Sequence, residues 1–253
     1  MSEVIYEIDN RIATITLNRP EKLNAINAEM SRQLYAALKD VRDNDDVWMM
    51  ILTANGRAFS AGRDLVERAD HGNTLPAPRN AEIYTLQTQI MKPTITAING
   101  ICMAAASGFA FSTDIRIAAE SVEFAWPHAK RGISSVSGPT ILGRHVPENI
   151  ALEYMYTGKR MTAREAERWG LVNHVVPDGT QLEFARAFAD DIITRAPMSM
   201  RLMKESLMRT RNLHLADAFT LGTYYSNRAS ATADAQEGLN AFKEKREPVW
   251  QGR

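Results

Sequence analysis

The stretch TITAINGICMAAASGFAFSTDIRIAAE, residues 94–120, joins two apolar runs that are typical of buried strands. The first run, 94–98, ends at the turn Asn99-Gly100, and the second, 114–120, follows a row of small residues. Strands that alternate with helices predict parallel β units with right-handed crossovers. The small residues 104–108 would let an anionic group approach backbone N–H groups at a helix start. Close packing of a helix against a sheet is the alternative, and this stretch leaves it open.

The α/β pattern extends towards the N-terminus. Two β-type runs, 4–8 and 11–18, meet at Asp9-Asn10 and predict a hairpin. Asn27 can cap a helix with one apolar face, and the apolar run 47–53 indicates a buried strand. The polar segment 66–80 is expected to be a mobile loop, with a helix after it that ends near Met91.

From about residue 138 the pattern becomes almost wholly helical. The helical segments are 147–158, 162–170, 182–196 and 197–246, and only 171–176 resembles a strand. We predict a βα core over residues 1–195 and a helical C-terminal region over residues 196–253.

The charge, cysteine content and apolar stretches of the chain argue against several classes of function. The 253 residues have a formal net charge of zero, which argues against nucleic acid as a partner. The single Cys102 excludes an intrachain disulfide and offers no cysteine cluster for a metal. The first residues lack a secretory signal pattern, and the most apolar stretch is too broken to span a membrane. A cytoplasmic protein with no membrane partner is therefore expected.

A second turn of small residues lies in AFSAGRDL, residues 58–65. Ser60, Ala61 and Gly62 allow close approach to the backbone, and Asp64 can cap a following helix. The amide of Arg63 would then point outward at a helix start, where it could stabilise a negative oxygen. One such turn could be purely structural, but two at strand ends suggest a paired oxyanion site.

Five segments in order, 17–27, 56–65, 98–120, 170–179 and 237–250, resemble the enoyl-CoA hydratase/isomerase (crotonase) family over nearly the whole chain. The resemblance implies an α/β fold, a crotonase-like spiral of ββα units with a helical C-terminal trimerisation region. It also implies an acyl-CoA substrate, a role in fatty acid metabolism, and a homotrimer or dimer of trimers. No permanently bound cofactor is implied, because coenzyme A enters as part of the substrate.

The same resemblance assigns roles to individual residues. The backbone N–H groups of Arg63 and Ala105 would hold the thioester oxygen as it becomes an enolate. Coenzyme A contacts are implied for Lys22, Asn24, Ala25, Ala61, Gly62, Asp64, Leu65, Phe242 and Lys245. Without the resemblance, Lys22 and Lys245 would be interpreted as solvated surface lysines.

The chain departs from the family at both catalytic glutamates. Their positions are occupied by Gly108 and His128, and no carboxylate occurs between residues 124 and 147. Ordinary hydratase activity is therefore expected to be poor. A carboxylate from Glu67, Asp70 or Glu82 could replace a missing glutamate, which the sequence leaves open.

His128 becomes the main candidate for acid–base chemistry, since a histidine exchanges protons near neutral pH. Ser135 and Ser137 lie where other branches of the family carry catalytic side chains, and His71 and His145 are weaker candidates. His128 could instead be a packed polar residue beside Trp126. Three functions stay open: an enoyl-CoA hydratase/isomerase-like enzyme, an acyl-CoA hydrolase or decarboxylase that uses His128, and a non-catalytic acyl-CoA-binding subunit.

Overall fold

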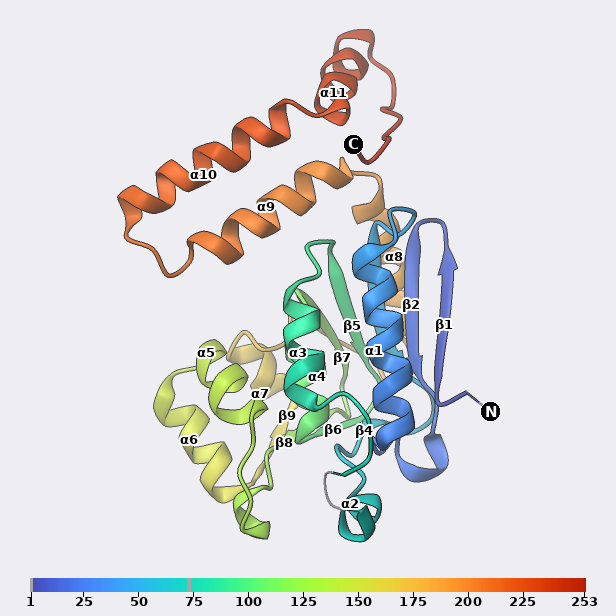
Figure 1. The fold of residues 1–253 in the computed structure, drawn as a ribbon, viewed down its shortest axis with the longest axis vertical. Coiled ribbons are helices and arrows are strands. Elements are labelled where there is room, and N and C mark those ends of the chain that lie inside the picture. Colours follow the sequence, from blue (N-terminus) through green and yellow to red (C-terminus); the bar gives the residue numbers. More distant parts are fainter. Residues whose placement is uncertain (1, 72–73) are drawn as a thin grey trace.

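Two β-sheets form the body of the computed structural model, which describes residues 2–71 and 74–253 (Figure 1). The large sheet has the order β1-β2-β3-β5-β7-β10, with β1 antiparallel to β2 and the other pairs parallel. Its strands are β1 (Val4–Asp9), β2 (Ile12–Leu17), β3 (Met49–Ala54), β5 (Thr94–Ile98), β7 (Ile115–Ala119) and β10 (His174–Val176). The small sheet has the order β4-β6-β8-β9, with strands β4 (Ala58–Ser60), β6 (Ile101–Met103), β8 (Glu123–Ala125) and β9 (Arg160–Thr162).

The chain passes repeatedly from the large sheet to the small one and then into helical structure. β3 leads to β4 and then to α2 (Leu65–His71) and α3 (Asn80–Thr88), and β5 leads to β6 and α4 (Ala105–Phe111). β7 leads in the same way to β8 and a 3-10 turn at Ala129–Arg131. This confirms the predicted spiral of ββα units.

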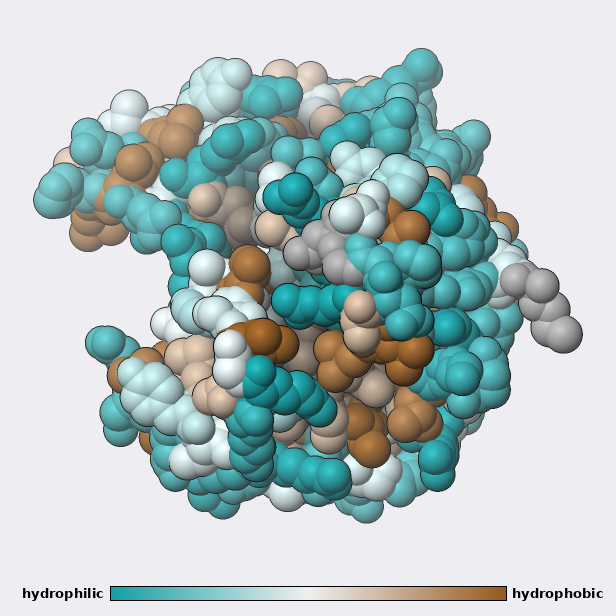
Figure 2. Space-filling model, turned by 60° about the horizontal axis from the view of Figure 1, so that its bottom comes forward, coloured by the Kyte–Doolittle hydropathy of each residue, from teal (hydrophilic) through white to brown (hydrophobic). Residues whose placement is uncertain are grey.

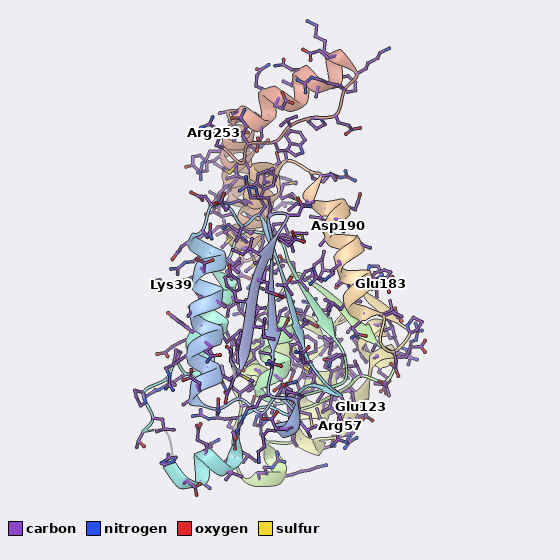
Figure 3. All side chains as sticks on the ribbon, turned by 90° about the vertical axis from the view of Figure 1, so that its right-hand side faces the viewer. Lys39, Arg57, Glu123, Glu183, Asp190 and Arg253 are labelled. Atoms are coloured by element: carbon purple, nitrogen blue, oxygen red, sulfur yellow. The ribbon has the colours of Figure 1, made fainter. Side chains whose placement is uncertain are left out.

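Helices cover both faces of the large sheet, which Figure 3 shows edge-on between α1, marked by Lys39, and α8, marked by Glu183 and Asp190. In β3, Met50 and Leu52 face the core under α1 and α3, whereas Met49 and Ile51 face α8. Both sets are fully buried, and the one polar residue of the strand, Thr53, is buried as well, so the strand has no solvent-facing side. α1 (Ala28–Asp43) begins at the predicted cap Asn27, and α8 spans Gln181–Ile193.

The remaining helices of the body are α5 (Gly143–His145), α6 (Glu148–Thr157) and α7 (Ala163–Arg168), with a π-turn at Gly138–Leu142 and a 3-10 turn at Pro20–Lys22. Beyond α8 the chain leaves the body. α9 (Pro197–Thr210) and α10 (Leu215–Ser230) form an antiparallel pair, here called the C-terminal arm, and α11 (Ala233–Glu244) follows (Figure 1). The predicted boundary between residues 195 and 196 stays a prediction.

The C-terminal arm exposes apolar side chains, which Figure 2 shows in brown at the upper left. They include Met203, Leu207, Leu215 and Phe219, each more than half exposed. In the described ranges, no helix is both long and apolar enough to cross a membrane.

Four expectations about local structure need correction. Residues 66–71 of the expected loop belong to α2, which buries no side chain and so shows no apolar periodicity; residues 72–73 lie outside the described structure. α3 ends at Thr88 rather than near Met91, and β3 begins at Met49. The short strand β9 is absent from the prediction because only Met161 of its three residues is buried.

Candidate active site

A cavity of about 480 Å³, here called the main cavity, lies where β4 and β6 end. Its wall is built from the turns after these two strands, from α2 and α3, and from the loop 128–137. The lining residues are Ala61, Arg63, Leu65, Arg68, Arg79, Asn80, Ala81, Tyr84, Ala104, Ala105, His128, Arg131 and Ile133–Ser137. The structure therefore brings together four of the predicted catalytic positions, Arg63, Ala105, His128 and Ser135.

The turn after β4 is held by backbone pairing with the segment before α1. The amide of Ile26 donates to the carbonyl of Gly62 (2.8 Å), and the amide of Asp64 donates to the carbonyl of Ile26 (2.9 Å). Gly62 has φ +91°, a conformation that side chains disfavour. The intervening amide of Arg63 has no acceptor in the described part of the chain.

The turn after β6 presents a second amide that has no acceptor among the described residues. Ala104 has φ 53° and ψ −116°, an unfavourable conformation for a residue with a side chain, and its amide donates to Ala125 O (2.8 Å). Ala105 then begins α4, so its amide lacks an intrahelical acceptor. A Cβ on Gly62 would lie 3.5 Å from the Ala105 nitrogen, which shows that the two turns touch. Two adjacent free amides can donate together to one negative oxygen.

Tyr84 occupies the space beside the first glutamate position. A Cβ on Gly108 would lie 2.5 Å from the Tyr84 hydroxyl oxygen, closer than real Cβ contacts allow. That hydroxyl donates to the carbonyl of Ala105 (2.9 Å), and burial raises the pKa of Tyr84. Tyr84 therefore stays a neutral phenol, and it blocks a side chain at position 108.

His128 lies half-buried in the wall of the main cavity, at the second glutamate position. Burial lowers its pKa below the ordinary value, and the cations Arg131 and Arg68 lower the pKa further. Its Nδ1 is buried and has no hydrogen-bond partner in the described residues. The backbone hydrogen bond expected for a merely packed histidine is thus not seen at this atom. A neutral imidazole is a proton acceptor at physiological pH.

Ser135 and Ser137 connect the loop to the turn after β6. Their hydroxyl oxygens lie 3.1 Å apart, and the Ser137 hydroxyl donates to the carbonyl of Ala104 (3.0 Å). The amide of Gly138 donates to Ser135 Oγ (3.1 Å). Both hydroxyls thus support the strained turn that orients the Ala105 amide.

The three candidate replacement carboxylates lie elsewhere. Glu67 accepts from the amide of Ala28 (2.9 Å), and Glu82 accepts from the amide of Arg79 (2.7 Å). Asp70 lines a second cavity of about 510 Å³. In the described chain no carboxylate lines the main cavity, so the open question from the sequence is answered against all three.

Six of the nine predicted coenzyme A contacts divide into two groups. Lys22, Ala25 and Asp64 line the second cavity together with His71, and Asp64 is ion-paired with Arg19 (2.7 Å). Ala61 and Leu65 line the main cavity, and Gly62 lies in the turn between them.

Asn24 lines neither of these two cavities. It is fully buried, and its side-chain amide donates to the carbonyls of Asn55 (2.9 Å) and Ala58 (2.8 Å), which holds the turn in place. Its contact with coenzyme A stays a prediction.

Phe242 and Lys245 lie far from the main cavity within one chain. They belong to α11 and its C-cap, and Figure 3 places Arg253, which follows α11, at the opposite end of the molecule from Arg57, which precedes β4. Their contact with coenzyme A stays a prediction. His145 lines a separate cavity of about 460 Å³, where its Nδ1 lies 2.8 Å from the carbonyl of Ile141.

Sequence reasoning missed Tyr84 and the arginines Arg68, Arg79 and Arg131 of the main cavity. Tyr84 follows Ile83 on α3 in an ordinary apolar pattern, which gives no sign of a site. The three arginines stand in polar segments where the sequence indicates only solvent exposure.

A ββα spiral whose strands β4 and β6 end at one cavity is the architecture of the crotonase type. The chain belongs to the enoyl-CoA hydratase/isomerase family, whose family model matches residues 7–253. It is accordingly an acyl-CoA enzyme of this broad class.

Two relatives illustrate the similarity. Carnitinyl-CoA dehydratase of Salmonella heidelberg is 37% identical over 265 residues, which cover 100% of both chains. Enoyl-CoA hydratase EchA19 of Mycobacterium tuberculosis is 33% identical over 258 residues, 99% of this chain and 97% of the relative. A crystal structure of enoyl-CoA hydratase from M. tuberculosis H37Rv superposes with a TM-score of 0.93 at 32% identity, covering 100% of both chains.

Proposed function

We propose that the chain transforms an acyl-CoA thioester through an enolate, whose oxygen accepts hydrogen bonds from the amides of Arg63 and Ala105. The observation that carries the proposal is that both free amides and His128 line the same main cavity. Preorganised donors of this kind stabilise charge that develops in a transition state. Coenzyme A would enter with the substrate.

His128 is the proposed base. Because Tyr84 blocks position 108 and no carboxylate of the described chain lines the cavity, the imidazole is the best-placed acceptor for the proton next to the thioester carbonyl. Its lowered pKa favours the neutral form that accepts a proton. The relatives' names refer to hydration and dehydration. For this chain we propose the enolate intermediate, but we do not propose water activation by paired glutamates.

The enolate can be tested directly by α-proton exchange of butyryl-CoA in D₂O, followed by mass spectrometry. We expect deuterium to appear in the acyl group of the intact thioester. The His128→Gln variant should exchange about 100-fold more slowly, as is usual when a general base is lost. His145→Gln is the matched control, because that histidine lines another cavity, and its exchange should equal that of the wild type. Equal exchange in both variants would remove His128 from the mechanism.

The pH dependence of the same exchange should follow His128. The base acts only when neutral, so the rate should fall as pH drops through its pKa, which lies below the ordinary 6.5. Arg131→Gln removes one of the cations that lower this pKa, and should therefore move the acid limb to higher pH. If the acid limb of the pH profile stays at the same pH in the Arg131→Gln variant, a group other than His128 is responsible for it.

Thioester hydrolysis is the second candidate. A neutral histidine with no carboxylate partner among the described residues of the cavity can activate water for attack on the carbonyl carbon, which needs no proton transfer at carbon. Release of free coenzyme A without deuterium incorporation would favour this reaction. Binding of coenzyme A esters with neither outcome would favour the non-catalytic subunit.

The proposed assembly is a homotrimer formed through the C-terminal arm. Leu215 and Phe219 are 69% and 67% exposed on one side of α10, more apolar surface than a lone helix pair usually leaves in water. Phe242 is 87% exposed on α11, where a neighbouring subunit could bring it to bound coenzyme A. Light scattering should give a molar mass three or six times that of the chain, and a monomer would contradict the assembly.

A further inference from the structure

The charged side chains that line the main cavity in the described residues are all arginines. Arg63, Arg68, Arg79 and Arg131 line it from four separate segments: the turn after β4, α2, the residue before α3, and the 3-10 turn 129–131. None of these guanidinium groups forms an ion pair with a carboxylate of the described residues. By contrast, Arg19 of the second cavity is paired with Asp64.

Such an arrangement favours an anionic ligand. Cations gathered in one hollow repel each other, and the repulsion is relieved when a carboxylate or phosphate enters. Arginine is suited to both anions, because its planar fork donates two parallel hydrogen bonds. The anion could therefore belong either to the phosphates of coenzyme A or to a carboxylate on the acyl group.

The position of His128 indicates which of these two sources of the anion the arginines bind. Arg68 and Arg131 line the same cavity as His128, and the amide of Arg131 donates to the carbonyl of His128 (2.9 Å). If the thioester oxygen sits at the Arg63 and Ala105 amides, the group next to His128 is the acyl chain. The phosphates of coenzyme A are separated from the thioester by the whole pantetheine arm, and Lys22 offers them a cation in the second cavity.

We infer that the acyl group of the substrate carries a free carboxylate, which Arg68 and Arg131 bind beside His128. This inference rests on the proposed function, since it places the thioester at the two amides. It names a substrate class, the acyl-CoA thioesters of dicarboxylic acids. It also disfavours a cationic acyl group such as a trimethylammonium, which would meet four unpaired arginines.

Calorimetric binding can test the inference without turnover. The probes are glutaryl-CoA, which ends in a carboxylate, valeryl-CoA, which has the same chain length and no charge, and coenzyme A alone. We expect glutaryl-CoA to bind the wild type about tenfold more tightly than valeryl-CoA, in line with one charge-assisted hydrogen-bonded pair. The Arg68→Gln/Arg131→Gln variant should lose this preference while binding valeryl-CoA and coenzyme A as the wild type does.

Arg144→Gln is the matched control, because Arg144 is also unpaired in the described chain but lines the 460 Å³ cavity. It should keep the tenfold preference. Equal affinity of the wild type for the two esters would overturn the inference. So would an equal loss for all three probes in the double variant, because the arginines would then bind coenzyme A phosphates. Failure of every probe to bind the wild type would overturn the proposed function as well.

Discussion

Replacing Gly62 with alanine is expected to slow α-proton exchange by on the order of 10³-fold. The new Cβ would lie 2.9 Å from Met103 O and 3.0 Å from Ala104 Cβ, so the turns after β4 and β6 must move apart. The φ of +91° adds backbone strain. Both free amides belong to these turns, and loss of a single oxyanion donor already costs about 10²- to 10³-fold.

The control for Gly62→Ala is Gly179→Ala. Gly179 has a similar φ of +85°, but a Cβ there meets nothing within 4 Å. It should show the backbone penalty in thermal melting and leave exchange unchanged. If Gly62→Ala also exchanged within about tenfold of the wild type, the paired amides could not be the main stabilisers of the enolate.

Placing glutamate at position 108 is expected to destabilise the protein and not to produce a hydratase. The side chain must displace the buried Tyr84, which breaks the hydrogen bond from its hydroxyl to Ala105 O. Overpacking together with a lost buried hydrogen bond should lower the free energy of unfolding by about 3 kcal/mol. Urea unfolding at fixed protein concentration measures this loss. Gly108→Ala should show most of it, because the clash begins at Cβ.

A double-mutant cycle with Tyr84→Ala separates the clash from other causes. In that background Gly108→Glu should cost at least about 1 kcal/mol less than in the wild type, because the space beside Cβ is then open. An equal cost in both backgrounds would mean that Tyr84 is not the obstacle. A single variant as stable as the wild type would mean that the ring moves aside freely.

Much of the fold follows from local patterns in the sequence. The hairpin turn, the cap at Asn27 and the buried strands carry signals that tertiary packing reinforces. α2 and β9 lack an apolar pattern, since α2 buries nothing and β9 buries only Met161. The local signal for α2 is the predicted cap Asp64, which accepts from the amides of Val66 and Glu67, whereas β9 depends on its pairing with β8.

The candidate site likewise has parts that the sequence predicts and parts that it does not. The turns at Gly62 and Ala105 could be predicted because small residues leave a clear pattern at strand ends. The contact between Tyr84 and Gly108 could not be predicted, because these residues are 24 positions apart in the sequence and meet only when α3 packs against α4. The arginines of the main cavity come from separate loops, and only the fold brings them together.

The contact between Tyr84 and Gly108 also restricts how this chain can change over generations. A mutation that restores an acidic residue at position 108 is disfavoured while the tyrosine is present, however useful the new carboxylate would be. A viable route must first shrink or move residue 84, a step that brings no catalytic benefit of its own. The two positions thus constrain each other, because the return of a glutamate at position 108 depends on an earlier change at residue 84.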